Sequence, residues 1–274
     1  MDTLHSLAVV IVTAGFLYRR ATMPKEVASR SDRWQNIYSR KGKQADNTTP
    51  LHVLGGYDQF TLQQWLDQIA ILVGNKGPKG DFDRNLAIKP SENVLEVGVG
   101  GGAFIDALQR NFGDFKLNGI DYCQSLIDRA SARLSGNFAQ GDARDLSTVD
   151  FATDSTYDVV ISFGVTQYLN DLDDAEKKFS EMVRVAKSGA RVVCCEVSDL
   201  AKKYIADEIR AKAYVGRKQV SNDVLTHLYI PKSFWSTDMC KKYDVTLVGI
   251  VDHSDIGLNY ATAPYRYSVF FVKN

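Results

Sequence analysis

Residues 94–104 read VLEVGVGGGAF, an apolar run that passes directly into a glycine-rich turn and then into a segment with helical spacing. Gly98, Gly100 and Gly102 lie in that turn. Such a turn lets the backbone approach a ligand closely, and it presents the N–H groups of the first helical turn to the ligand. The stretch therefore predicts a strand, a turn and a helix that together hold a ligand at the carboxyl end of the strand.

The glycine spacing alone allows two kinds of ligand. Gly98, Gly100 and Ala103 also satisfy the G-x-G-x-x-G/A fingerprint of dinucleotide-binding folds, so a nicotinamide-dependent oxidoreductase is one interpretation. Glu96, however, precedes Gly98 by two residues at the end of the predicted strand. A carboxylate in that position repels a pyrophosphate but suits an ammonium or sulfonium group.

The rest of the chain alternates between strand-like and helix-like segments, which predicts a parallel sheet covered by helices on both faces. Strands are expected over Asn93–Val97, Lys116–Ile120, Asn137–Gln140, Asp158–Ser162 and Arg191–Val197, and helices over Thr61–Val73, Ala103–Phe112, Ser125–Leu134 and Leu172–Ala186. The runs Val245–Val251 and Tyr265–Val272 are β-rich with no helix-length segment between them. They predict an antiparallel pair at the sheet edge.

Two more acidic residues end predicted strands. Asp121 closes the second strand, and Asp142 follows the third in the run FAQGDARDL. An acid at the end of the second strand accepts hydrogen bonds from the hydroxyls of a ribose, and one after the third suits the exocyclic amine of adenine. Because the carboxyl ends of parallel strands meet at one edge of a sheet, we expect Glu96, Asp121 and Asp142 to lie close together.

These residues resemble the class I S-adenosylmethionine-dependent methyltransferases. The matching pieces are ExGxGxG at residues 96–102, the acids of GIDYC and QGDA, and the run YDVVISFGVTQYL. The resemblance covers roughly residues 91–200. It implies an α/β, three-layer Rossmann-like fold with a seven-stranded, mostly parallel sheet, a C-terminal antiparallel hairpin and an N-terminal helical cap. It also implies S-adenosyl-L-methionine as the cofactor.

The resemblance further implies which residues hold the cofactor and which shape the acceptor pocket. The cofactor-binding residues are Glu96, Gly98, Gly100, Gly102, Asp121, Tyr122, Asp142, Ala143 and Phe163. Glu96 would orient the ammonium group, Asp121 would hold the ribose, and Asp142 with the backbone of Ala143 would bind the adenine edge. The residues of the acceptor pocket are Gly164, Gln167 and Tyr168.

A neutral hydroxyl or amine acceptor needs a base, whereas a thiolate does not. His227, in VLTHLYIPKSFW, is the first candidate for the catalytic base, and His52, in PLHVLGGYD, is the second. A lone histidine is more often structural than catalytic, so both assignments compete with a packing role. Glu196 and Asp255 are candidates for orienting groups. The run DRWQNIY, with Trp34 and Tyr38, is interpreted as a helix that closes over the cofactor.

The composition argues against nucleic acid as the partner. Lys and Arg number 33 and Asp and Glu number 33, so the formal net charge of the 274 residues is zero, whereas a nucleic-acid binder carries a basic excess. The Asn/Asp-Pro-Pro-aromatic run of adenine and cytosine methylation is absent from residues 162–168. No C-x-x-C pair exists among the 4 cysteines, so no metal site is predicted. A small-molecule acceptor is expected.

The N-terminal part divides into an apolar segment, residues 1–18, and a basic linker with a helical cap, residues 19–90, ahead of a catalytic domain at residues 91–274. Residues 19–46 carry eight basic and three acidic side chains. Residues 4–20 are interpreted either as a membrane tether or as a soluble helix or strand packed on the domain. A tether would place the remainder on the cytoplasmic side; the alternative is a soluble cytoplasmic protein.

The predicted function is therefore transfer of a methyl group from S-adenosylmethionine to an O, N or S atom of a small, potentially hydrophobic molecule. Two alternatives stay open. One is the nicotinamide-dependent oxidoreductase, and the other is a non-catalytic, methyltransferase-like partner subunit.

Overall fold

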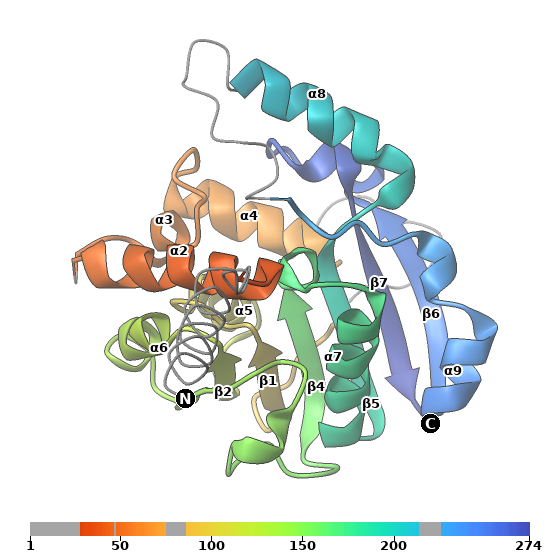
Figure 1. The fold of residues 1–274 in the computed structure, drawn as a ribbon. Helices are drawn as coiled ribbons and strands as arrows, with labels where there is room; N and C mark the ends of the chain where they lie inside the picture. The colour runs from red at the N-terminus through yellow and green to blue at the C-terminus, as the bar shows by residue number, and fades with distance from the viewer. Residues whose placement is uncertain (1–27, 47, 75–85, 214–225) are drawn as a thin grey trace, which may run out of the picture.

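The computed structural model describes residues 28–46, 48–74, 86–213 and 226–274 (Figure 1). Its centre is a seven-stranded sheet with the strand order β3-β2-β1-β4-β5-β7-β6. In that order the strands are β3 (Asn137–Gln140), β2 (Lys116–Asp121), β1 (Asn93–Val97), β4 (Tyr157–Phe163), β5 (Ala186–Ser198), β7 (Arg266–Lys273) and β6 (Val245–Asp252). The order reverses on either side of β1, so a crevice is expected at the carboxyl ends of β1 and β4.

Strands β1 to β5 pair in parallel, and β7 runs antiparallel to both β5 and β6. The predicted seven-stranded sheet with a C-terminal antiparallel pair is thus confirmed. Four of the five residues of β1 are buried, as expected for a parallel strand covered on both faces. Strand β5 carries a bulge between Cys194 and Val197, and the intervening Glu196 has φ +62°.

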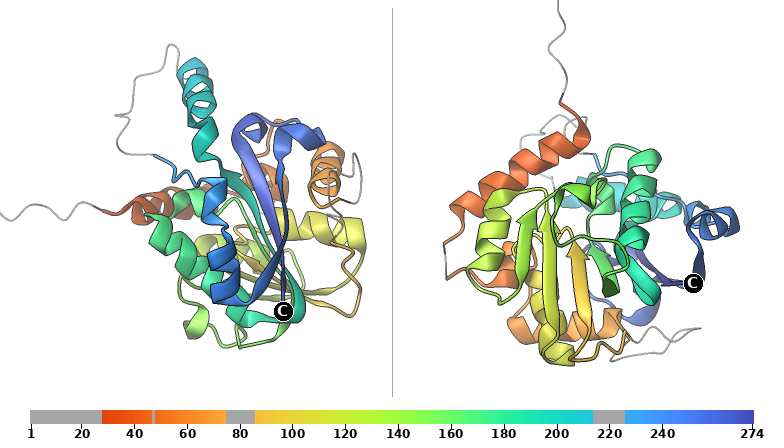
Figure 2. Two further views of the ribbon diagram at one scale, coloured as in Figure 1. Left: turned by 90° about the vertical axis from the view of Figure 1, so that its right-hand side faces the viewer. Right: turned by 90° about the horizontal axis from the view of Figure 1, so that it is seen from below.

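Helices cover both faces of the sheet (Figure 2). The helices are α2 (Arg30–Gln44), α3 (Leu51–Leu54), α4 (Leu62–Leu72), α5 (Ala103–Phe112), α6 (Gln124–Ser131), α7 (Leu172–Val185), α8 (Lys203–Ala213) and α9 (Thr237–Tyr243). Buried side chains of α4 and α5 form one core with the sheet, and those of α7 and α9 form a second core on the opposite face. The architecture therefore has three layers.

Local sequence accounts for the helices that precede the sheet. Ser29 caps α2 and Thr61 caps α4, and in both cases the residue three positions on bonds back to the capping residue, forming a capping box. The predicted helix over Thr61–Val73 is thus found as α4. The run that contains Trp34 and Tyr38 forms α2, which packs against α6 through the tight contact of Gly42 with Ser125.

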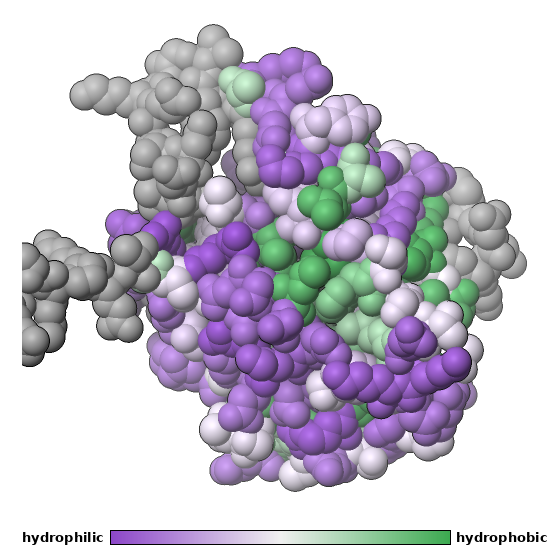
Figure 3. All heavy atoms as spheres, turned by 45° about the vertical axis from the view of Figure 1, so that its right-hand side comes forward, coloured by the Kyte–Doolittle hydropathy of each residue, from purple (hydrophilic) through white to green (hydrophobic). Residues whose placement is uncertain are grey.

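The last third of the chain contains elements that sequence periodicity did not predict. Helix α8 projects from the body, as Figures 1 and 2 both show, and its Tyr204 is 64% exposed. Helix α9 is short, and two 3-10 turns, η5 (His253–Ile256) and η6 (Ala263–Tyr265), connect β6 to β7. The face seen in Figure 3 is mostly hydrophilic, with hydrophobic residues gathered near its centre.

Among the described residues, none of the helices combines the length and the apolar composition that crossing a bilayer requires. Residues 4–20, on which the predicted membrane tether rests, lie outside the described part of the chain. The tether and the boundary of the apolar segment at residue 18 therefore stay predictions.

Candidate functional site

A cavity lies where the strand order reverses, lined by residues of α2 and by residues at the carboxyl ends of β1, β2 and β4. Every residue predicted to bind the cofactor except Gly102 lines it, and so do the three predicted acceptor-pocket residues. Residues 98, 121, 142 and 164 are far apart in the sequence, and the parallel sheet brings them together because their strands end at one edge. The cavity is thus one site built from the ends of several strands.

The glycine turn after β1 forms the floor of this cavity. Gly98 has φ +86° and Gly100 has φ +54°, a conformation that favours glycine. A Cβ atom at Gly98 would overlap the side chain of Val165, whereas one at Gly100 would meet no atom within 4 Å. The turn therefore packs tightly against the loop after β4 at Gly98 and leaves open space beside Gly100 for a ligand.

Glu96 places a buried carboxylate at this turn. Its side chain is 2% exposed, and no described residue bonds to its Oε2 atom. Burial, and next the negative charge of Asp121, raise the pKa of Glu96 well above its ordinary value. A buried carboxylate with an unsatisfied oxygen is costly, so this site gains stability when a cation or a hydrogen-bond donor occupies the cavity.

Asp121, at the end of β2, is held rigidly by the backbone. The N–H of Gly100 donates to Oδ2 at 2.8 Å, and the N–H of Cys123 donates to Oδ1 at 2.8 Å. Burial raises the pKa of this carboxyl, and the two backbone hydrogen bonds oppose the rise. Each carboxylate oxygen keeps a lone pair, so Asp121 can accept two further hydrogen bonds, such as those of a vicinal diol.

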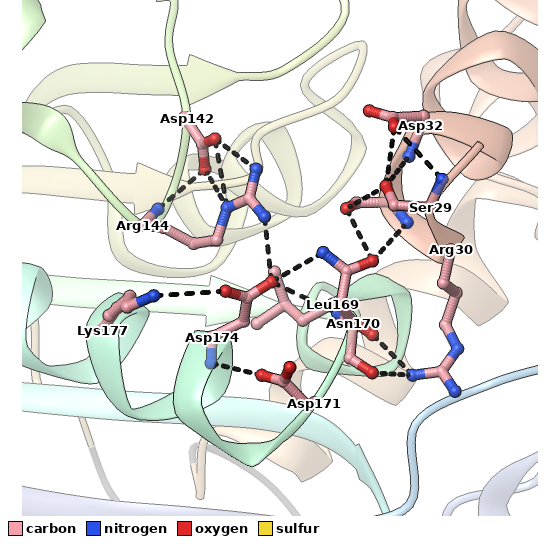
Figure 4. A network of polar contacts seen from close by, with 11 residues as sticks. Ser29, Arg30, Asp32, Asp142, Arg144, Leu169, Asn170, Asp171, Asp174 and Lys177 are labelled. Carbon is pink, nitrogen blue, oxygen red and sulfur yellow. Dashed lines mark hydrogen bonds and ion pairs between the residues drawn. The ribbon is translucent and has the colours of Figure 1, made fainter. Parts of the chain in front are cut away.

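Asp142 lines the cavity but is already engaged by a cation, as Figure 4 shows. Arg144 donates from Nε to Oδ1 at 2.9 Å and from Nη2 to Oδ2 at 2.6 Å. The same guanidinium reaches Asp174 on α7 at 2.9 Å. From the sequence, a ligand amine was expected beside Asp142, but no partner from the protein. The structure adds Arg144, whose backbone N–H and guanidinium both donate to Oδ1, so Oδ2 is the oxygen that could still accept from such an amine.

The same polar network ties α2 to the sheet over the cavity (Figure 4). Asn170 donates to Asp174 at 2.8 Å and accepts from the backbone N–H of Ser31 at 3.1 Å. Arg30 donates to the carbonyl oxygens of Leu169 and Asn170 at 2.8 and 2.6 Å. The N-terminus of α2 is therefore anchored to the segment that precedes α7, and a chain of hydrogen bonds links it to Asp142.

Aromatic side chains enclose the part of the cavity next to Gly164. Trp34 and Tyr38 of α2 lie against Tyr168, with the Trp34 and Tyr168 ring centroids 4.8 Å apart and the two tyrosine hydroxyls 2.6 Å apart. Phe163 stacks on Phe104 with a centroid separation of 4.4 Å. This side of the cavity is thus mostly apolar and aromatic.

Among the described residues that line the cavity, neither predicted base appears. His227 packs behind the aromatic wall, 5.1 Å from Trp34 and 5.6 Å from Tyr168 between ring centroids. His52 is buried, and its Nε2 bonds to the carbonyl of Phe60 at 3.0 Å. His227 therefore lies next to the aromatic side of the cavity, and His52 is occupied by a structural contact.

Behind Gly164 lies a buried polar cluster made of Glu196 on β5, His253, Tyr260 and Arg266 on β7. The Tyr260 hydroxyl donates to Glu196, and His253 Nδ1 is 3.0 Å from the same oxygen. Burial alone raises the pKa of Glu196, but His253 and Arg266 outweigh it and lower the pKa below its ordinary value. Asp255, the other predicted orienting residue, is exposed and bonds only to Ser254 among the described residues.

Sequence reasoning missed His253, Tyr260 and Arg266 as neighbours of the site. They lie 57 to 70 positions after Glu196 and share no spacing motif with it. The one local signal of this cluster was Arg266 itself, a charged residue within the β-rich run at the end of the chain. A strand in a sheet is expected to be largely buried, and charged residues are seldom buried without a partner.

Comparisons with known proteins agree with this geometry. Residues 94–189 match the family described as a methyltransferase domain. A ubiquinone/menaquinone biosynthesis C-methyltransferase from Desulfotalea psychrophila is 30% identical over 112 residues, which are 41% of this chain and 44% of that protein. A malonyl-[acyl-carrier protein] O-methyltransferase from Bacillus anthracis is 31% identical over 91 residues, 33% of each. The alignments span less than half of these relatives.

Solved structures show the same fold at low sequence identity. A chain from the complex between the Haloferax volcanii Trm112 methyltransferase activator and a methyltransferase has a TM-score of 0.55 and 14% identity. The likeness covers 90% of this chain and 99% of that one. An S-adenosylmethionine-dependent methyltransferase from Thermotoga maritima has a TM-score of 0.51 and 14% identity, covering 81% and 96%.

Proposed function

Because this chain carries a class I S-adenosylmethionine-dependent methyltransferase domain, we propose that it transfers a methyl group from S-adenosylmethionine to a small, largely apolar acceptor. The observation that carries the proposal is the buried carboxylate of Glu96, which has an unsatisfied oxygen and lies beside Asp121 at the glycine turn. Two carboxylates in a low-dielectric cavity favour a cation and disfavour a pyrophosphate. This electrostatic preference supports a sulfonium cofactor over a dinucleotide.

The proposed cofactor contacts follow from the groups around the cavity. Glu96 would accept from the ammonium group, and the space beside Gly100 would take the methionine part. Asp121 would accept from the two ribose hydroxyls with its remaining lone pairs. Tyr122, Asp142 and the backbone of Ala143 would surround the adenine. Each of these groups lines the cavity, which supports the assignment.

When bound, S-adenosylmethionine supplies a methyl carbon activated by the adjacent sulfonium. The chain would contribute orientation and exclusion of water. Phe163, Gly164 and Tyr168 border the side of the cavity that α2 encloses, and Trp34 and Tyr38 close it. The acceptor is therefore proposed to lie between the loop after β4 and helix α2.

The apolar lining supports a small, ring-containing or otherwise hydrophobic acceptor, as does the quinone-pathway relative. His227 is the base we propose for an acceptor that needs deprotonation, because it borders Tyr168. A base must come within hydrogen-bond reach of the proton that it removes. Rotation of Tyr168 or Trp34 on acceptor binding would open that path.

Isothermal titration calorimetry with S-adenosylmethionine, S-adenosylhomocysteine and NADH tests the proposal. We expect binding of the first two and no binding of NADH. Incubation with labelled S-adenosylmethionine and a metabolite extract should then place label in a small molecule. Affinity for NADH without affinity for S-adenosylmethionine would refute the proposed function, and cofactor binding without any transfer would support the non-catalytic alternative.

A further inference from the structure

Gln167 lies on the 3-10 turn η2 (Thr166–Tyr168), directly after β4, and its side chain faces the acceptor side of the cavity. The residue is 4% exposed and lines the cavity together with Gly164 and Tyr168. Its Nε2 atom lies 3.6 Å from the position that a Cβ atom would take on Gly164. The end of the Gln167 side chain therefore borders the space proposed for the acceptor.

Arg266 determines which way this amide points. Its Nη1 donates to Gln167 Oε1 at 2.9 Å. A guanidinium has donors and no acceptor, so the amide oxygen must face Arg266 and the NH₂ group must face away from it. No described residue accepts a hydrogen bond from Gln167 Nε2. The NH₂ group therefore remains available on the wall of the cavity, where an oxygen atom of a ligand can accept from it.

The cluster behind Gln167 holds Arg266 in place. Arg266 is 2% exposed, and its Nη1 also donates to the carbonyl oxygen of Glu196 at 2.9 Å and to Ser198 Oγ at 2.5 Å. The Glu196 carboxylate lies 3.7 Å from Nε and supplies the compensating charge. The left-handed backbone of Glu196 at the bulge of β5 is a costly conformation for a residue with a side chain, so the surrounding structure must stabilise it.

We propose that Arg266 is a positioning residue that fixes the Gln167 amide as a hydrogen-bond donor, so that the site selects acceptors presenting an oxygen lone pair. This inference rests on the proposed function and deepens it. The substrate class is an apolar, ring-containing compound with a carbonyl, enolate or phenolate oxygen placed against Gln167. A hydrocarbon of the same shape leaves the Nε2 donor unsatisfied and binds more weakly.

The test uses two probes with the same ring skeleton, 1-tetralone and tetralin, in which a carbonyl group of the first is a methylene group in the second. Both are titrated by calorimetry into the protein saturated with S-adenosylhomocysteine. The wild-type protein should prefer the ketone by about tenfold, the difference expected for one hydrogen bond from a donor that a bound hydrocarbon would cover without pairing it. Gln167→Glu keeps the side-chain shape and the contact with Arg266 but replaces the donor with an oxygen, so it should abolish the preference. Gln59→Glu, the same substitution at an exposed position outside the cavity, should retain it.

Arg266 is tested by the same ratio of dissociation constants. Arg266→Met releases the amide and should remove the ketone preference, while Arg266→Lys, which still donates toward Gln167 Oε1, should restore much of it. If Arg266→Met does not fold, the Arg266→Lys and Gln167→Glu variants still test whether the amide sets the ketone preference. No ketone preference in the wild type, or a preference that Gln167→Glu leaves intact, would overturn the inference. Failure of the wild type to bind S-adenosylhomocysteine would instead refute the proposed function.

Discussion

Replacement of Glu96 by glutamine tests the electrostatic basis of the site. The substitution keeps the shape of the side chain, removes the buried negative charge and replaces one acceptor oxygen with an NH₂ donor. In the ligand-free protein this charge is unfavourable, because burial and then Asp121 raise the pKa of the carboxyl. In the complex the charge would be compensated by the ammonium group of the cofactor. The same change should therefore stabilise the free protein and weaken the complex.

The size of the effect follows from the hydrogen bond that is lost. A hydrogen bond to a charged partner contributes about 1.5–3 kcal/mol, which corresponds to roughly 10- to 150-fold in affinity. Glu96 is almost fully buried, so solvent screens the interaction little. We expect Glu96→Gln to weaken S-adenosylmethionine binding within that range.

The pH dependence gives a second readout, with a defined sign. A carboxyl whose folded pKa lies above its unfolded value binds protons more tightly in the folded state. Its contribution to stability is therefore present at low pH and is lost as the pH rises from the unfolded toward the folded pKa. The ligand-free wild type should lose this part of its stability over that interval, while its cofactor affinity should rise. Glu96→Gln should flatten both curves, leaving the smaller contribution of Asp121.

Calorimetry measures the affinity, and chemical denaturation without ligand measures the free energy of unfolding. Glu92→Gln is the matched control, because Glu92 lies just before β1, pairs with Arg191 at 2.6 Å and is not among the residues lining the cavity. It should leave the affinity unchanged. An unchanged affinity in Glu96→Gln, or equal losses in both variants, would show that Glu96 does not interact with a cationic ligand.

Three further changes test other parts of the site. Asp121→Ala removes the acceptor proposed for both ribose hydroxyls and should lower S-adenosylmethionine affinity at least 100-fold by calorimetry; retained affinity would refute that role. His227→Ala should lower turnover with cofactor affinity unchanged, and full turnover at all pH values would exclude His227 as the base. Arg144→Met breaks the contacts with Asp142 and Asp174 and should lower the free energy of unfolding by about 2 kcal/mol in urea titrations. Arg110 is half exposed and, among the described residues, pairs with Asp106 alone, so Arg110→Met should cost less than about 1 kcal/mol. Equal losses of unfolding free energy in the two arginine variants would show that Arg144 has no special structural role.

The strands and the site edge were predictable because their signals are local. Apolar runs that end in glycine or aspartate predicted β1, β2 and β3 almost to the residue, and the capping residue Thr61 predicted the start of α4. The parallel arrangement follows from the alternation of strands and helices. Since parallel strands end at one edge, Glu96, Asp121 and Asp142 could be placed together without coordinates.

The more distant contacts around the site were not predictable, because they join residues from different elements. Arg144 follows Asp142 by two residues, but its second partner, Asp174, comes from α7. His227 meets Trp34 of α2 although the two residues lie far apart in the sequence. Short helices such as α9 have too few residues for a periodic signal, so packing rather than propensity forms them.

The sequence by itself thus determined the sheet, the glycine turn and the three acids at its edge, because each depends on residues that are neighbours in the chain or on the direction of parallel strands. Only the tertiary structure decided what the acceptor side presents to a ligand. Arg266 and Gln167 are 99 positions apart, and they meet because β7 inserts between β5 and β6. The direction of an amide is set by the donors that surround it in space, and no spacing rule in the sequence encodes that neighbourhood.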